Sequence, residues 1–188
     1  SFSTHRIFST KKLVKVPEGI ELENVVTLMT KGITTFYLLH KTYPVKSGET
    51  ILFHAAAGGV GQILCQWAKA LGATTIGTVS TAEKAEVAKA AGCHFPVVRS
   101  EKNFVDVVRE VTSDEGCAVV YEAIGKDTLQ DSLDSLRPMG VCAAYGHVSG
   151  PPDPVDIIQD LGRRGSLFIT RPAIMHYVAK RADLEWTA

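Results

Sequence analysis

Residues 50–61, TILFHAAAGGVG, form an apolar run that passes directly into a glycine-rich turn. In a strand–turn–helix unit, Gly58 would let the backbone approach a phosphate, and Gly61 would let the helix pack closely on the strand. Ala56 stands where such turns usually have their first glycine, which is tolerable if φ stays negative there. Glycines also gather in tight turns that bind nothing, so the turn indicates a dinucleotide site only within an alternating α/β pattern.

From residue 50 onward, apolar strand patterns alternate with helical patterns. The sequence predicts strands over 50–56, 74–80, 94–98, 117–124, 141–146 and 166–170, and helices over 58–72, 81–92, 103–112, 126–137 and 154–162. A further helix is predicted over 21–41, with its apolar stripe broken at Gly32. Repeated β-α-β units produce a parallel sheet covered on both faces. The predicted fold class is therefore α/β: a Rossmann, doubly wound, six-stranded parallel sheet with helices on both faces and a ligand site at the carboxyl ends of its strands.

Composition excludes several classes of protein. The 188 residues are 45% hydrophobic and 21% charged, with a formal net charge of zero, which is ordinary for a globular domain and argues against a nucleic-acid partner. The apolar runs are too short to span a membrane, and the first ten residues lack the apolar core of a signal peptide. The four cysteines have no metal-binding spacing. These features predict a cytoplasmic protein without structural zinc or disulfides.

The end of the second predicted strand bears on the choice of cofactor. NAD-binding units usually place an acidic residue there for the ribose hydroxyls, whereas this strand ends in Ser80 and Thr81, with Lys84 one helical turn later. A hydroxyl and an ammonium group would bind a 2′-phosphate that a carboxylate would repel, which favours NADPH over NADH. The alternative is that Thr81 is only a helix N-cap and Lys84 a solvated lysine whose charge Glu83 offsets.

Several segments together resemble one family. FHAAAGGVGQ (53–62), CQWAKALGA (65–73), KGITTFYLLHKTY (31–43), VVYEAIGKDTLQDSLDSLRPMG (119–140) and GSLFITRP (165–172) are similar to the zeta-crystallin-like NADPH:quinone oxidoreductases, in the zinc-free branch of the medium-chain dehydrogenase/reductase superfamily. The resemblance covers essentially the whole chain. It implies a domain order in which residues 1–20 are the exit segment of a missing GroES-like catalytic domain, 21–175 the Rossmann NADP-binding domain, and 176–188 the start of the returning segment.

The resemblance also implies roles for individual residues. The matching positions are Tyr37 near the nicotinamide, Gly59 and Val60 on the pyrophosphate, Ser80 and Lys84 on the 2′-phosphate, Tyr145, Gly146, His147 and Val148 beside the nicotinamide ribose, and Ile169, Thr170 and Arg171 near the nicotinamide amide. Tyr37 could equally be a core aromatic residue, and His147 an exposed loop histidine. His54, before the turn, is interpreted as a hydrogen-bonded core histidine.

Two positions depart from the family pattern. Arg99 replaces a tyrosine that is common in relatives, so it either stacks on the adenine and pairs with the 2′-phosphate or is a surface arginine. Ala123 replaces a serine of some relatives, which removes one hydrogen bond.

The resemblance implies an NADPH-dependent quinone oxidoreductase that passes a hydride to a quinone or an α,β-unsaturated carbonyl, with this chain as mainly its cofactor-binding part. No catalytic acid, base, nucleophile or metal ligand is identified, and the chain alone is expected to turn over little. The quinone or enone would bind through the missing domain, and the edge strand 166–170 would form a homodimer. The alternatives are a non-catalytic NADPH-binding protein, crystallin-like or RNA-binding, and an enoyl reductase of the same superfamily.

Overall fold

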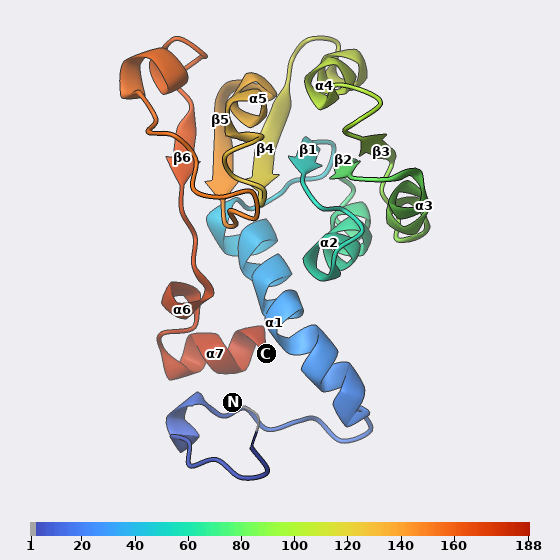
Figure 1. Ribbon diagram of the computed structural model, residues 1–188. Helices are drawn as coiled ribbons and strands as arrows, with labels where there is room; N and C mark the ends of the chain where they lie inside the picture. Colours follow the sequence, from blue (N-terminus) through green and yellow to red (C-terminus); the bar gives the residue numbers. More distant parts are fainter. Residues whose placement is uncertain (1–2) are drawn as a thin grey trace.

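The computed structural model describes residues 3–188 (Figure 1). Within them, six parallel strands form one sheet in the order β3-β2-β1-β4-β5-β6. The strands are β1 Thr50–Phe53, β2 Thr74–Val79, β3 Phe95–Val98, β4 Cys117–Glu122, β5 Leu136–Ala144 and β6 Phe168–Thr170. This order reverses between β1 and β4, as in a doubly wound sheet, so the predicted fold class is confirmed.

Helices connect these strands and cover the sheet. The helical elements are η1 Thr10–Lys12, α1 Leu22–Tyr37, η2 Leu38–Thr42, α2 Gly59–Ala70, α3 Ala82–Ala90, α4 Phe104–Thr112, α5 Leu129–Asp134, η3 Ile157–Gly162, α6 Ile174–Tyr177 and α7 Arg181–Thr187. In Figure 1 the arrowheads of β4 and β5 point toward α1, which lies beyond the carboxyl ends of the strands. The carboxyl edge, where the ligand site was predicted, therefore lies toward α1.

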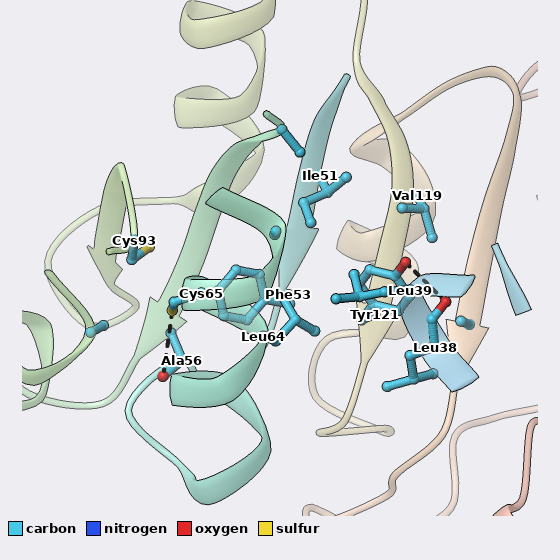
Figure 2. Close-up of a cluster of buried hydrophobic side chains, with 14 of the residues drawn as sticks. Leu38, Leu39, Ile51, Phe53, Ala56, Leu64, Cys65, Cys93, Val119 and Tyr121 are labelled. Carbon is cyan, nitrogen blue, oxygen red and sulfur yellow. Dashed lines mark hydrogen bonds between the residues drawn. The ribbon is translucent and has the colours of Figure 1, made fainter. Parts of the chain in front are cut away.

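Successive residues of each strand serve opposite faces of the sheet. Ile51 and Phe53 of β1 belong to a core cluster that includes residues of α1 and α2, whereas Leu52 belongs to a second cluster with residues of α4 and α5. Figure 2 shows Ile51 and Phe53 in the first cluster together with Tyr121 of β4. Both faces are thus buried, which explains why these strands lack a strict polar–apolar alternation.

The helix predicted over 21–41 is present as α1 followed by η2. α1 continues through Gly32, where nothing lies within 4 Å of the position a Cβ would take, and the helix packs against α2. The irregularity comes later, where η2 widens into a π-helical turn. The hydroxyl of Tyr121 donates to the carbonyl oxygen of Leu38 at 3.2 Å, which satisfies an acceptor in this turn (Figure 2).

The predicted end of the fifth helix is wrong. Helix was expected up to residue 137, but α5 ends at Asp134 and Leu136 already pairs with Cys117 as the first residue of β5. The register of the β4–β5 pairing then shifts between Cys117 and Val119, and Met139 takes a left-handed φ of 60°. This bulge accommodates Pro138 inside the strand, where the sequence pattern had suggested a helix terminator.

The first and last segments of the described chain meet beside α1. Arg181 at the start of α7 donates to the carbonyl oxygen of Lys11 at 3.2 Å and to that of Leu13 at 2.5 Å. Trp186 of α7 lies edge-on against Phe36 of α1, with ring centroids 4.8 Å apart. These contacts do not test the predicted domain order, and residues 1–2 of the predicted exit segment lie outside the described residues.

Candidate cofactor-binding site

The glycine-rich turn connects β1 to α2, whose first residue is Gly59 and whose N-cap is Gly58. Ala55 takes a left-handed φ of 56°, and the N–H of Gly58 donates to its carbonyl oxygen at 2.8 Å. Ala56 is not among the residues with positive φ, so the condition under which its methyl group is tolerable is met. The unusual conformation falls instead on Ala55, where it costs on the order of 1 kcal/mol.

Gly61 is the glycine that the packing of this turn requires. A Cβ at Gly61 would lie 2.5 Å from the carbonyl oxygens of both Ala55 and Ala56, so α2 could not approach the end of β1 with any larger residue there. At Gly58 a Cβ would lie 3.0 Å from the oxygen of Ala55. The first N–H groups of α2 have no acceptor within the helix and point toward this turn, as in a phosphate-binding site.

The residues predicted for the 2′-phosphate lie together beside the turn. The ammonium group of Lys84 donates to the hydroxyl of Ser80 at 3.0 Å. Thr81 is the N-cap of α3, as the alternative interpretation held, and accepts from the N–H of Lys84 at 3.3 Å. Among residues 3–188, Lys84 forms no ion pair with Glu83 or another carboxylate. Lys84 is exposed, as the alternative interpretation held, so these contacts leave both interpretations of Lys84 open.

A cleft of about 300 Å³ joins these residues to the turn. Arg99 reaches it from the end of β3, where its N–H donates to the carbonyl oxygen of Val79 at 3.1 Å. The cleft is lined by Ala55, Ala57, Gly58, Thr78, Val79, Ser80, Lys84, Arg99, Ile124 and Val148. The structure thus brings one predicted loop residue, Val148, and Arg99 to the same cavity as Ser80 and Lys84.

A second cleft of about 260 Å³ is lined mainly by residues at the ends of β4 and β5 and by residues that follow β4, β5 and β6. Its lining residues are Glu122, Gly125, Leu129, Ala144, Gly146, His147, Pro151, Pro152 and Arg171. Arg171 follows β6 and donates to the carbonyl oxygen of Tyr145 at 2.6 Å, and its guanidinium lies 3.2 Å from Nδ1 of His147. Arg171, the residue after Thr170 of β6, therefore connects the end of β6 to the loop 145–148, and the contact of these residues with a nicotinamide stays a prediction.

Of the other predicted residues, Ala123 lines neither cleft but is packed against the loop after β5: a Cβ on Gly146 would lie 2.5 Å from the carbonyl oxygen of Ala123. Tyr37 is 3% exposed and its ring stacks on Tyr177 of α6 at 4.3 Å. Burial raises the pKa values of both Tyr37 and Tyr145. This packing explains Tyr37 as a core residue without any ligand, so its contact with a nicotinamide stays a prediction.

Sequence reasoning missed two residues near the turn. The aliphatic part of Lys31, on α1, crosses the start of α2, so that a Cβ on Gly59 would lie 2.5 Å from Lys31 Cδ and Cε. Glu122, at the end of β4, is fully buried and lies 3.2 Å from Nε2 of His54. A carboxylate that closes an otherwise apolar strand was the available signal for Glu122. For Lys31 there was none, because its position depends on how α1 crosses α2.

No metal site accompanies these clefts in the part of the chain that the structure describes. Residues 3–188 contain no group of three or more His, Cys, Asp or Glu side chains able to hold a metal ion. The four cysteines, Cys65, Cys93, Cys117 and Cys142, are buried free thiols. No helix among these residues is both long and apolar enough to cross a membrane.

The fold and the sequence both match known oxidoreductases. The chain is 54% identical to a 2-haloacrylate reductase of Burkholderia sp over 187 residues, and 46% identical to a quinone oxidoreductase of Pseudomonas aeruginosa over 177 residues. These alignments cover 98% and 94% of this chain but 56% and 54% of the relatives, so the chain spans about half their length. The structure of the Escherichia coli quinone oxidoreductase complexed with NADPH superimposes with a TM-score of 0.89 at 42% identity, over 93% of this chain and 53% of that one.

A family model links these similarities. Residues 59–178 match the model described as "Zinc-binding dehydrogenase". This range includes α2, the strands β2 to β6 and the loops after β4 and β5 that line the two clefts. The match covers more than half of the chain and begins at the glycine-rich turn. The chain therefore belongs to the zinc-binding dehydrogenase family, within the medium-chain dehydrogenase/reductase superfamily.

Proposed function

We propose that the chain is the cofactor-binding part of an NADPH-dependent reductase in the zinc-free branch of this superfamily. The observation that supports this most directly is the Ser80–Lys84 contact of 3.0 Å at the tip of β2, in a cleft that Arg99 also lines. Two cationic groups and a hydroxyl, with no carboxylate among the residues lining that cleft, suit a 2′-phosphate. The similar Escherichia coli enzyme, whose structure contains NADPH, supports the same choice.

The proposed reaction is hydride transfer from NADPH to a quinone or an α,β-unsaturated carbonyl. NADPH would supply the hydride, and this chain would bind the cofactor and orient its nicotinamide. Residues 21–175 would form the cofactor domain, with 1–20 and 176–188 leading to and from a catalytic domain that completes the acceptor site. The similarity to a 2-haloacrylate reductase as well as to quinone oxidoreductases supports an acceptor with a conjugated double bond. The four free thiols suit a reducing compartment such as the cytoplasm.

Lys84→Ala tests the cofactor assignment. A charge-assisted contact with a phosphate contributes roughly 1.5–3 kcal/mol, so we expect NADPH to bind about one to two decades more weakly and NADH to bind almost unchanged. Isothermal titration of both cofactors into both proteins measures the difference. Lys89→Ala, which removes an exposed lysine from the same helix, is the matched control. Equal losses for NADPH and NADH would show that Lys84 only supports the fold, and a wild type that prefers NADH would contradict the assignment.

The edge strand β6 is proposed to form a homodimer through residues 166–170. β6 has a strand partner on one side, β5, and its Phe168 is 59% exposed. Nearby Ile157 and Ile158 of η3 are 76% and 68% exposed. An uncovered, apolar sheet edge of this kind favours pairing with a second copy.

Phe168→Asp is expected to convert this dimer to a monomer, because it places a charge in the centre of the apolar edge. Sedimentation equilibrium on the wild type and the variant measures the mass directly. Val87→Asp, which changes a 43% exposed valine on the distant helix α3, should leave the dimer intact. A wild type that remains monomeric at high concentration would exclude the proposed interface.

A further inference from the structure

Glu122 is an unusual carboxylate for the interior of a sheet. It is 0% exposed, its carboxylate lies 3.2 Å from Nε2 of His54, and within residues 3–188 it forms no ion pair with a lysine or arginine. Burial raises its pKa, but hydrogen bonds from His54, from the hydroxyl of Ser132 and from the N–H of Gly125 outweigh burial and keep the pKa below its usual range. An ionised, buried carboxylate without a permanent cation is costly to the fold unless hydrogen-bond donors surround it.

One set of donors comes from the loop after β4. Oε1 of Glu122 accepts from the N–H of Ile124 at 2.6 Å and from the N–H of Gly125 at 3.0 Å. Ile124 is a wall of the cleft that contains Ser80 and Lys84, and Gly125 is a wall of the cleft that contains Arg171. Through these backbone N–H groups, Glu122 therefore holds a segment that lines both clefts.

A second set of donors links Glu122 to α5 and to the glycine-rich turn. The hydroxyls of Thr128 and Ser132 donate to Oε2 at 2.9 and 2.5 Å. Because Ser132 uses its proton there, it can accept from Nε2–H of His54 at 2.9 Å, a hydrogen that also faces Oε2 of Glu122 across 3.2 Å. Nδ1 of His54 then accepts from the hydroxyl of Thr78 at 2.8 Å. His54 directly precedes Ala55 in the turn, and Thr78 also lines the Ser80–Lys84 cleft. The network thus joins opposite walls of the same cleft.

We propose that Glu122 is a positioning residue for the cofactor: it holds the glycine-rich turn and the loop after β4 at their binding separation before the cofactor enters. This inference rests on the proposed function of the cleft. Glu122 does not touch the 2′-phosphate region at Ser80 and Lys84 but acts on walls that any dinucleotide would contact. Loss of Glu122 should therefore lower the affinities for NADPH and NADH by the same factor, whereas loss of Lys84 should lower the affinity for NADPH alone.

Glu122→Gln tests the proposal, because the amide keeps the shape but presents an NH₂ group to some of the donors. We expect both cofactors to bind about tenfold more weakly, as for a lost buried acceptor. In the cofactor-free protein, NMR should show faster hydrogen exchange at the N–H groups of Ile124 and Gly125. Thr128→Val removes one hydrogen-bond donor and keeps the charge of Glu122, so it should lower the affinity for both cofactors by about threefold. This variant provides the test if Glu122→Gln does not fold.

Ser135→Ala is the matched control. Ser135 carries a buried hydroxyl at the C-terminal end of α5, the helix whose N-cap is Thr128. Its hydroxyl donates to the carbonyl oxygen of Asp131 at 2.8 Å rather than to Glu122. It should lower stability without changing the affinity of the folded protein. The proposal is wrong if the folded Glu122→Gln variant binds both cofactors with wild-type affinity, or if the N–H groups of Ile124 and Gly125 exchange hydrogen at wild-type rates. Either result would show that Glu122 only supports the core. A wild type that binds neither cofactor would instead contradict the proposed function, whatever the exchange rates show.

Discussion

Ser80→Asp is expected to reverse the cofactor preference of the chain. The hydroxyl of Ser80 accepts from the ammonium of Lys84 at 3.0 Å, at the place proposed for the 2′-phosphate. An aspartate there would both pair with Lys84 and repel the phosphate, and like charges in contact cost several kcal/mol. We expect NADPH to bind more than about 100-fold more weakly, and NADH to bind more tightly because the carboxylate can accept from its ribose hydroxyls.

Titration of both cofactors at low and at high salt measures this reversal. The loss of NADPH affinity should shrink at high salt, because screening weakens the repulsion at an exposed site. Ser47→Asp adds the same charge in the turn before β1, at the amino ends of the strands, and should leave the cofactor preference unchanged. If Ser80→Asp binds NADPH as tightly as the wild type, the 2′-phosphate does not lie at the tip of β2.

Gly61→Ala is expected to be the most destabilising single substitution among the glycines of the turn. Its Cβ would meet the carbonyl oxygens of Ala55 and Ala56 at 2.5 Å, and backbone atoms cannot rotate away as a flexible side chain can. Relief would require α2 to move away from β1 and out of the first core cluster. We expect a loss of about 3 kcal/mol in the free energy of unfolding, the upper range for overpacking.

Urea denaturation followed by circular dichroism measures that loss, and Gly32→Ala provides the contrast. Gly32 lies inside α1 with nothing within 4 Å of its would-be Cβ, so alanine there should stabilise the protein by about 0.5–1 kcal/mol. The two variants make the same chemical change in opposite surroundings. A Gly61→Ala protein as stable as the wild type would mean that the close approach of α2 to the turn is not required.

The sequence predicts the order of elements better than their ends. Apolar strand segments that alternate with helical segments along the chain are sufficient to predict the parallel sheet, because strands buried on both faces form continuous apolar runs. The end of α5 was misplaced because Leu136 is drawn into β5 by its pairing with Cys117, a contact distant along the chain. The helix predicted over 21–41 does continue through Gly32, and packing of α1 against α2 compensates for the weak helix propensity of glycine there.

The candidate site divides in a similar way. Ser80, Lys84 and Gly58 could be placed by their distance from a strand end, and the structure brings them to one cleft. The left-handed conformation of Ala55 and the role of Glu122 could not be predicted in this way, because they depend on how the turn meets β2, β4 and α5 in space. Tyr37 shows the opposite case, because its stacking on Tyr177 explains a residue for which the sequence left a ligand role open.

The reversal of strand order between β1 and β4 also bears on how the protein folds. β1, β2 and β3 pair through short crossovers, and so do β4, β5 and β6, but the pairing of Ile51 with Val119 joins segments far apart along the chain. Closing that long loop is entropically costly, so the two halves of the sheet are expected to form early and to dock slowly along the β1–β4 seam. The cleft between the glycine-rich turn and Ile124 spans the same seam. A ligand bound there would contact both halves at once, and would therefore slow their separation during unfolding more than it hastens their docking.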